Sequence, residues 1–458
     1  MKRKSVAVSL ITVLLYMLLG STIACAPSPV QTFYNLTLVA RFGGELVYNI
    51  EGHTEDSDCP AGRVCMLIGV PRGQVVAITA VPDEGFAFAD WTGDVDAIAD
   101  VNAATIAITM SGNCTIVANF IREIRDWHDL DAIRENLDLN CVLISDLDST
   151  TAGYEALAGP NANGGKGWEP IGTVATGENW MWYYPFTGSL DGRGYEIRDF
   201  FINRPEESHI GLFGYIREGV ITDVGVVNVT VTGLRLVGGL VGWNEDGTVN
   251  NSYAAGSVTG NEYVGGLAGW NYYGTILGSY ADGTVTGGWV VGGLVGYNSG
   301  NIDSCYSTGT VTGDDGIGGL VGGNDGGTIT NCHATGTVTG YDVVGGLVGY
   351  NDGEIDSCHA IGDVTGTSDF NPDPPEDYEG GVGGLVGYNT GDIDASHATG
   401  SVTHTSWYTG GLVGQNWYGT VSNSYWESTG IVTGTRTVGG LIGYNTGNVD
   451  TCYASGDV

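Results

Sequence analysis

Three histidines recur at one position of successive repeats in the C-terminal half of the chain: His333, His359 and His397. Stacked neutral imidazoles could hold a metal ion, because imidazole nitrogen is a common metal ligand. Other repeats carry tyrosine at this position, and the free interchange favours an aromatic shelf over a metal site. The tyrosines are Tyr253, Tyr280, Tyr306, Tyr425 and Tyr453.

Cysteines share a second repeat position, where other repeats have serine or alanine. They are Cys305, Cys332, Cys358 and Cys452. The interchange with small residues favours buried packing. A disulfide between neighbouring repeats is the alternative, although strands stacked in register rarely offer the geometry that a disulfide requires.

Carboxylates occupy a third position, at Asp303, Asp356, Asp394 and Asp450. Paired carboxylates could hydrolyse a glycosidic bond or bind calcium weakly, and a solvated acidic face is the simpler alternative. From Val237 onward the chain has 23 Asp or Glu, one Arg (Arg436) and no Lys. The formal net charge of −36 argues against nucleic acid as a partner, since phosphate binding needs clustered Lys and Arg.

The elements that position these residues are internal repeats. The run Val237-Gly238-Gly239-Leu240-Val241-Gly242 recurs with its leucine at intervals of 27, 27, 26, 27, 38, 27 and 29 residues. No unit can bury its own apolar face, but stacked units form a continuous core. The repeats therefore predict an all-β fold, a right-handed parallel β-helix (a solenoid) over residues 186–458, with glycines at tight corners that need positive φ.

One asparagine follows the Gly-Leu-Val-Gly run in each close repeat. The set is Asn244, Asn271, Asn298, Asn324, Asn351, Asn389, Asn416 and Asn445. In stacked coils their amides would form a hydrogen-bonded ladder. A polar binding stripe is the alternative, and the ladder is favoured because asparagine satisfies backbone groups in turns.

The full unit reads Val-Gly-Gly-Leu-Val-Gly-aromatic-Asn, then Gly-x-Ile and Gly-x-Val-Thr-Gly, and it resembles the GLUG motif. GLUG repeats accompany the catalytic domain of some IgA-cleaving metallopeptidases. The HExxH motif of such enzymes does not occur in this sequence, and neither does Gly-x-Ser-x-Gly, a P-loop or Cys-x-x-Cys. The chain would therefore not be a protease of that kind, and no cofactor is expected. The resemblance covers roughly residues 186–458 and implies a β-solenoid.

A small all-β module is predicted over residues 34–121, where short runs alternate apolar and polar residues. The passage from Gly85-Phe86 to Trp91-Thr92-Gly93, with Val117-Ala118-Asn119-Phe120 at the end, resembles the divergent internalin B-type repeat of bacterial surface proteins. That resemblance implies a non-catalytic spacer. Export would make a Cys59–Cys65 disulfide plausible, and two free thiols are the alternative.

The N-terminus has the pattern of a secretory signal: basic Lys2, Arg3 and Lys4, an apolar run, then small residues before Cys25. The end of residues 1–25 resembles a bacterial lipobox, which implies a lipoprotein anchored through Cys25. Thr22 departs from the leucine of that pattern, and ordinary cleavage is the alternative. Residues 26–33 would be a linker.

A cap for the first coil is expected in residues 122–185, because an uncovered coil would expose its core. Residues 124–136 predict an amphipathic helix with Trp127, Leu130 and Ile133 on one face. Later, residues 369–379 form an acidic, proline-rich insertion between repeats. With Trp407, Tyr408, Trp417, Tyr418 and Trp426 nearby in sequence, it is the predicted contact surface. The solenoid ends within a unit, and we expect the protein to continue further.

These features together predict an exported, lipid-anchored cell-surface protein that acts as a structural or adhesion scaffold without enzyme activity. Its expected partners are the membrane, through the lipid, and a glycan or a protein of a host or neighbouring cell. The rival is a carbohydrate-active β-helix enzyme, a polysaccharide hydrolase or lyase. A lyase needs cations to hold acidic sugars, and the repeats have almost none.

Overall fold

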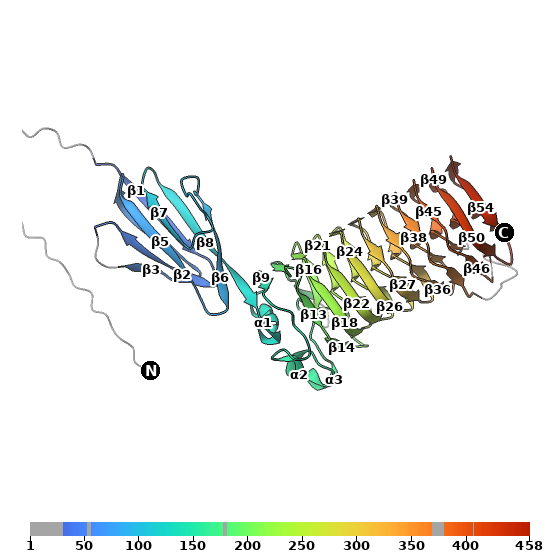
Figure 1. Cartoon of the computed structure of the whole chain (residues 1–458), viewed down its shortest axis with the longest axis horizontal. Helices are drawn as coiled ribbons and strands as arrows, with labels where there is room; N and C mark the ends of the chain where they lie inside the picture. The colour runs from blue at the N-terminus through green and yellow to red at the C-terminus, as the bar shows by residue number, and fades with distance from the viewer. Residues whose placement is uncertain (1–30, 53–55, 177–180, 369–379, 406) are drawn as a thin grey trace, which may run out of the picture.

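The computed structural model describes residues 31–458 except 53–55, 177–180, 369–379 and 406. The predicted signal segment with Cys25, most of the linker and the 369–379 insertion lie outside the described residues. Two bodies meet at an angle, a small β module and a long solenoid, with three short helices beside the junction (Figure 1). In the described part of the chain, no helix is long and apolar enough to cross a membrane.

The small module is a sandwich of two sheets around one core. One sheet contains β1 (Phe33–Ala40), β4 (Arg63–Pro71), β6 (Phe86–Gly93) and β8 (Cys114–Ile124), and the other contains β2 (Gly44–Ile50), β3 (Ser57–Cys59), β5 (Val75–Pro82) and β7 (Thr105–Thr109). Alternate residues such as Leu36, Leu38 and Trp91 are buried between the sheets. This inward and outward alternation is the pattern that predicted strands from the sequence.

Strand β8 belongs to both bodies. Its first part pairs with β1 and β6, and its last three residues, Arg122–Ile124, pair in parallel with β9 (Asn140–Leu143) of the solenoid. Arg122 also pairs with Asp129 at 3.0 Å and lies over the ring of Phe86. The two bodies are therefore joined by a shared strand, and the side-chain contacts of Arg122 stabilise the junction.

Helices cap the first coils. Helix α1 (Trp127–Asp131) is capped by Asp126, whose carboxylate accepts a hydrogen bond from the Asp129 amide at 2.9 Å. The chain continues as the 3₁₀ turn η1 (Ala132–Glu135). Trp127, Leu130 and Ile133 are buried, as their spacing predicts. Two further short helices follow, α2 (Tyr154–Leu157) and α3 (Ala162–Gly165), and then the strand pair β10 (Thr173–Thr176) and β11 (Met181–Tyr184).

The solenoid is the predicted parallel β-helix of about nine coils. A typical coil contributes β19 (Arg235–Gly238), β20 (Val241–Glu245), β21 (Thr248–Asn250) and β22 (Tyr253–Thr259), one strand to each of four sheets. We name these sheets I (β15, Ser208–Ile210, to β51, Val438–Gly439), II (β16, Phe213–Arg217, to β52, Ile442–Asn445), III (β9 to β53, Asn448–Asp450) and IV (β13, Glu196–Arg198, with β54, Tyr453–Asp457, in the last coil). Like residues stack on like: Val241 pairs with Ala268, and Asn244 with Asn271.

A few glycines of the repeats have the expected positive φ, such as Gly278, Gly316 and Gly326, but those of the Gly-Gly-Leu run serve close packing instead, which corrects the expectation for them. A Cβ on Gly265 would lie 2.1 Å from the Ala268 carbonyl oxygen, and one on Gly266 would lie 2.3 Å from that of Gly293. The left-handed corners are filled mostly by other residues, among them Asn251, Ser304 and Asn331. Neighbouring coils approach so closely that a side chain in the Gly-Gly-Leu turn would separate them.

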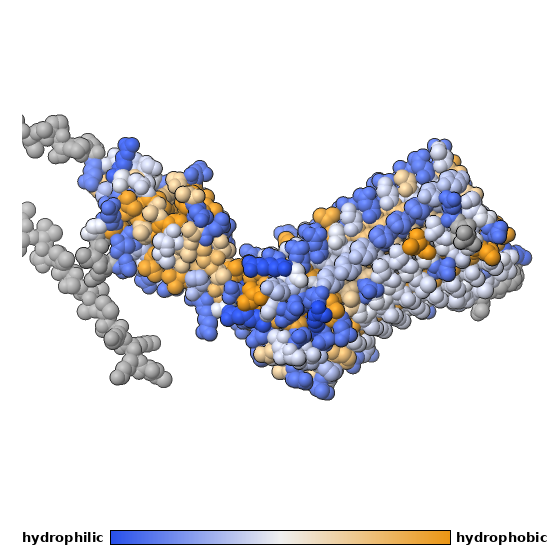
Figure 2. All heavy atoms as spheres, viewed as in Figure 1, coloured by the Kyte–Doolittle hydropathy of each residue, from blue (hydrophilic) through white to orange (hydrophobic). Residues whose placement is uncertain are grey.

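The longer interval of 38 residues between Leu347 and Leu385 does not disturb the stacking of the coils. Val344 pairs directly with Val382, and Asn351 with Asn389, so coils on either side of the insertion are neighbours. Figure 2 shows rows of similar hydropathy that run along the solenoid. Each row is one repeat position seen over several coils.

Candidate functional site

The eight asparagines form a continuous ladder inside the solenoid. The Nδ2 of each one donates to the Oδ1 of the next, at 2.8 Å in the central rungs. The same Nδ2 donates to a glycine carbonyl of its own turn, as Asn324 does to Gly327 at 3.0 Å. All except Asn445 are fully buried. Because ligands cannot reach buried amides, this row holds coils together and does not form a binding stripe.

The tyrosines and histidines of sheet IV form a second ladder, partly exposed along the outer edge. Ring centroids lie 4.7 to 5.1 Å apart, and the planes are within 9° of parallel, from Tyr253 to Tyr453. Burial lowers the pKa of His333, His359 and His397 from the ordinary value, and neighbouring imidazoles lower it further for His333 and His397. In the part of the chain that the structure describes, no three His, Cys, Asp or Glu side chains are grouped to hold a metal ion.

The thiols of the cysteine row are free; Cys305, Cys332 and Cys358 are buried, and Cys452 is half-buried. Cys305, Cys332 and Cys358 each direct Sγ toward a carbonyl two residues earlier in the chain. A hydrogen bond with the Cys332 thiol raises the pKa of Cys305, and burial raises it further. Since the thiolate is the reactive form, these side chains are packing residues.

The aspartates of sheet III tie one coil to the next. Asp303 Oδ1 accepts from Thr330 Oγ1 and Asn331 Nδ2, both at 2.9 Å. Asp394 accepts in the same way from Ser422 and Asn423. These hydrogen bonds lower the pKa of both carboxyl groups, so each is an anion with an assigned structural partner.

Two aromatic clusters lie on sheet II and its flanking corners. In the first coils Trp243 stacks on Tyr215 at 4.6 Å and on Trp270 at 5.5 Å between centroids. In the last coils Trp417 and Tyr408 contact Tyr444. Trp426 is a correction to the predicted contact surface: it is fully buried and fills the core where the preceding coil has Ala398.

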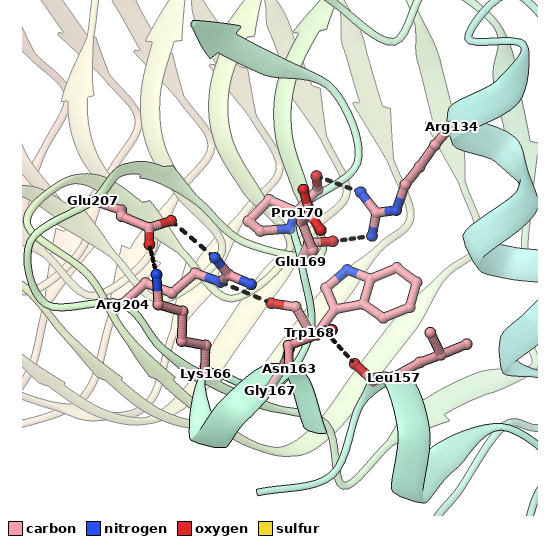
Figure 3. Close-up of polar contacts among 10 residues, drawn as sticks. All are labelled: Arg134, Leu157, Asn163, Lys166, Gly167, Trp168, Glu169, Pro170, Arg204 and Glu207. Atoms are coloured by element: carbon pink, nitrogen blue, oxygen red, sulfur yellow. Dashed lines mark hydrogen bonds and ion pairs between the residues drawn. The ribbon is translucent and has the colours of Figure 1, made fainter. Parts of the chain in front are cut away.

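The cap contains a polar cluster that the sequence analysis missed, which we call the cap clamp (Arg134, Lys166, Arg204 and Glu207; Figure 3). Three successive carbonyls accept hydrogen bonds from its guanidinium groups. Arg204 Nε donates to Trp168 at 3.2 Å, and Arg134 donates to Glu169 and, at 2.7 Å, to Pro170. Glu207 joins Arg204 and Lys166 through ion pairs of 2.9 and 2.7 Å.

Trp168 anchors the clamp in the core. Its side chain is fully buried, its indole Nε1 donates to the Leu212 carbonyl at 3.0 Å, and Arg134 lies over its ring at 4.8 Å. The clamp fixes the segment that leads into the first coils. One signal in the sequence could have found it: five of the 16 Lys and Arg residues of the chain lie within residues 134–204.

In the small module, Cys59 and Cys65 form a disulfide. Cys59 is buried and the pair closes the short turn between β3 and β4. The bridge lies far along the chain from the cap clamp and has a structural role.

Comparison with protein families gives two matches. Residues 69–123 match the divergent InlB B-repeat domain. Eight segments match the GLUG motif: residues 233–259, 260–286, 287–312, 313–339, 340–365, 378–403, 405–429 and 434–458. Both families are those that the sequence resembles by its motifs.

Two named relatives match over short stretches. One, of Evansella cellulosilytica, has the provisional name Gly-rich membrane protein and is 42% identical over 92 residues, which is 19% of this chain and 10% of that protein. The other is halomucin of Haloquadratum walsbyi, 38% identical over 97 residues, which is 21% of this chain and 1% of that protein. The matched stretches are thus a small part of either relative.

Among solved structures, one provisionally described as an immunoglobulin A1 protease from Bacteroides ovatus aligns with a TM-score of 0.36 at 20% identity, over 73% of this chain and 84% of that chain. An IgA1 protease aligns with a TM-score of 0.32 at 15% identity, over 91% and 29%. Similarities of this size carry no argument about activity.

Proposed function

Because the chain carries eight GLUG motifs behind a divergent InlB B-repeat domain, we propose that it is an exported cell-surface protein that serves as a rigid scaffold and presents a binding face. The observation that carries the proposal is the continuity of the molecule. One strand, β8, joins module and solenoid, and one asparagine ladder runs through the coils. Such a body holds its outer face at a fixed distance and direction.

The surface location is supported by the names of the two relatives, a Gly-rich membrane protein and halomucin. The basic and apolar start of the chain and the residues before Cys25 support export and lipid attachment at that cysteine. A lipid anchor would stabilise membrane association by about 0.8 kcal/mol per buried methylene. The acidic solenoid would stay soluble outside the membrane.

Location is tested by expressing the full chain and a Cys25→Ala variant in a bacterial host. We expect the wild-type protein to incorporate labelled fatty acid, to fractionate with membranes and to be cut by protease added to intact cells. The variant should lose the label and the membrane association. Wild-type protein that stays in the cytoplasm would contradict export itself.

The scaffold role is tested by incubating the purified protein with a panel of immobilised polysaccharides. We expect retention on at least one of them, with no new reducing ends and no unsaturated products. Sustained turnover that is lost when an Asp or Glu is substituted would instead establish the rival, a carbohydrate-active enzyme. Retention on none would remove the glycan as the partner.

A further inference from the structure

A cleft of about 400 Å³ opens beside the cap clamp. Its walls come from two segments that are far apart in the chain, residues 169–174 and 204–210. The first segment precedes and includes the start of β10, and the second leads into β15. The cleft therefore lies where the cap meets the first coils.

The floor of the cleft is held rigidly. Arg204 is only 8% exposed, and its guanidinium is fixed by Glu207 and by the Trp168 carbonyl (Figure 3). The backbone of Glu169 and Pro170 is held from the other side by Arg134. A site whose walls are fixed before binding loses less conformational entropy when a ligand enters.

Two carboxylates in the cleft have no assigned partner. Glu169 and Glu206 are exposed, and neither side chain has an ion pair or hydrogen bond within the described chain. Glu207, in contrast, is matched by two cations. The free groups of the cleft are thus acceptors, which disfavours an anionic ligand and suits a ligand that donates hydrogen bonds.

His209 adds a ring to the lining. It has a left-handed backbone, with φ 64°, and its imidazole centroid lies 5.7 Å from that of Trp243. Burial lowers the pKa of His209 to about 4, so the ring is neutral at pH 7. Thr173 and Ser208 supply hydroxyl groups, while Pro170 and Ile210 also line the cleft but are buried.

We propose that this cleft binds one saccharide unit without negative charge, whose hydroxyl groups donate to Glu169 and Glu206 and whose C–H surface packs near His209. A sugar ring presents hydroxyl groups at its edge and C–H groups on its faces, and the lining has counterparts for both. The inference rests on the proposed function and names the ligand class and the place for it.

The test is calorimetric titration of the full-length protein at pH 7 with three probes: cellotetraose, chitotetraose and tetragalacturonic acid. We expect one of the two uncharged probes to bind. Glu169→Gln and Glu206→Gln should each weaken binding of that probe tenfold or more, because a hydrogen bond to a carboxylate becomes a weaker one to a neutral amide oxygen. His209→Asn, which tolerates the left-handed backbone, should weaken it at least threefold.

Glu354→Gln is the matched control, since this glutamate is exposed on β39 (Glu354–Asp356) in sheet III, and its affinity should equal that of the wild type. Circular dichroism and the thermal midpoint show whether each variant is folded. Equal affinity in wild type, Glu169→Gln and Glu206→Gln would contradict the assignment of the saccharide site to this cleft. It would not contradict glycan retention by the protein as a whole. Preference for the galacturonic acid probe, or binding of calcium alone, would also contradict that assignment.

Discussion

The cap and the coils are stabilised by different kinds of contact. In the cap each interaction occurs once: Arg134 holds two particular carbonyls, and Trp168 has a particular pocket. In the coils each interaction is repeated between copies of the same residue, such as Asn298 with Asn324. A substitution in the cap therefore affects one set of partners, whereas a substitution in a ladder removes hydrogen bonds to the coils on both sides.

The largest effect is expected from breaking the asparagine ladder at its centre. Asn324→Ala leaves one N–H of the Asn298 amide without an acceptor, and it removes one of the two donors to Asn351 Oδ1 and to the Gly327 carbonyl. A buried hydrogen bond contributes about 0.5–1.5 kcal/mol, and an unsatisfied buried N–H costs about 1–3 kcal/mol, so we expect a loss of about 3 kcal/mol in urea unfolding. Hydrogen exchange should rise in the coils on both sides.

The last rung is the control for this prediction. Asn445 is exposed; it accepts from Asn416 Nδ2 and donates to the Gly447 carbonyl of its own turn. Because water can reach this end of the ladder and replace the lost acceptor, Asn445→Ala should cost no more than about 1 kcal/mol. Similar losses at both positions would show that the ladder does not stabilise through buried hydrogen bonds.

The cap should respond with a smaller and more local loss. Arg134→Ala removes the donors to the Glu169 and Pro170 carbonyls and the contact with the Trp168 ring. We expect a loss of about 2 kcal/mol, in the range for hydrogen bonds to charged groups, and faster hydrogen exchange confined to residues near 168–170.

Arg134→Lys distinguishes charge from geometry. An ammonium lacks the fork that reaches two carbonyls, so this variant should recover only part of the stability. Full recovery would mean that the positive charge alone matters. Exchange that spreads into the repeats would contradict the local character assigned to the cap.

A gain is expected at one corner of sheet III. Ala395 has a left-handed backbone, φ 47°, at the position where the neighbouring coil has Asn423 with φ 48°. Asn423 donates to Asp394, so Ala395→Asn should remove strain and could donate to Asp356, which pairs with Asp394. We expect about 1 kcal/mol of added stability, measured as the urea midpoint.

The reverse change provides the comparison for that corner. Asn331→Ala removes a hydrogen bond to Asp303 and leaves alanine at φ 53°, so it should lose a similar amount. Opposite signs for the two variants are the expected result. A loss in both would indicate that side-chain fit outweighs backbone strain.

The smallest effect should be a pH dependence from the histidines of sheet IV. Their pKa is lowered in the folded protein, so the unfolded chain takes up protons first. Stability is then complete above about pH 6.5, the unperturbed value, and declines as pH falls toward the folded pKa. Replacing His333, His359 and His397 by tyrosine should flatten urea midpoints measured between pH 7.5 and 4.5.

Tyrosine is the residue that other coils have at this position, such as Tyr306 and Tyr425, so the triple variant should fold. Tyr306→Phe is the control and should keep the wild-type pH dependence. An unchanged slope in the triple variant would assign the acid sensitivity to other groups, such as buried His404, whose pKa burial lowers to about 4.

The repeats could be predicted because the same residue types recur at nearly constant spacing from one coil to the next. The spacing of Leu240 and its equivalents gives the coil, and the recurrence of Asn244 gives a row of stacked amides. The reason for the glycines could not be found in this way, because a close approach between coils leaves the same residue pattern as a corner with positive φ. The structure separates the two, because a Cβ on Gly266 would lie 2.3 Å from the Gly293 carbonyl oxygen of the next coil.

For the cap, the sequence predicts that a helix is present but not which contacts it makes. Apolar spacing indicates the helix face of Trp127 and Leu130, but contacts made once leave no periodic signal. Arg204, Glu169 and His209 come from segments separated by up to 40 residues, and their meeting depends on how the cap docks. Trp426 shows the same limit within the repeats: its type suggested exposure, but its register placed it in the core.

Strand β8 makes the joint between module and solenoid rigid, so that the joint does not act as a hinge. Bending there would have to break the backbone pairing of Arg122–Ile124 with β9 as well as the ion pair between Arg122 and Asp129. A load on the outermost coil is therefore carried through the backbone of neighbouring strands to the module, as in a cantilever. Whatever holds the module also sets the direction in which every coil points.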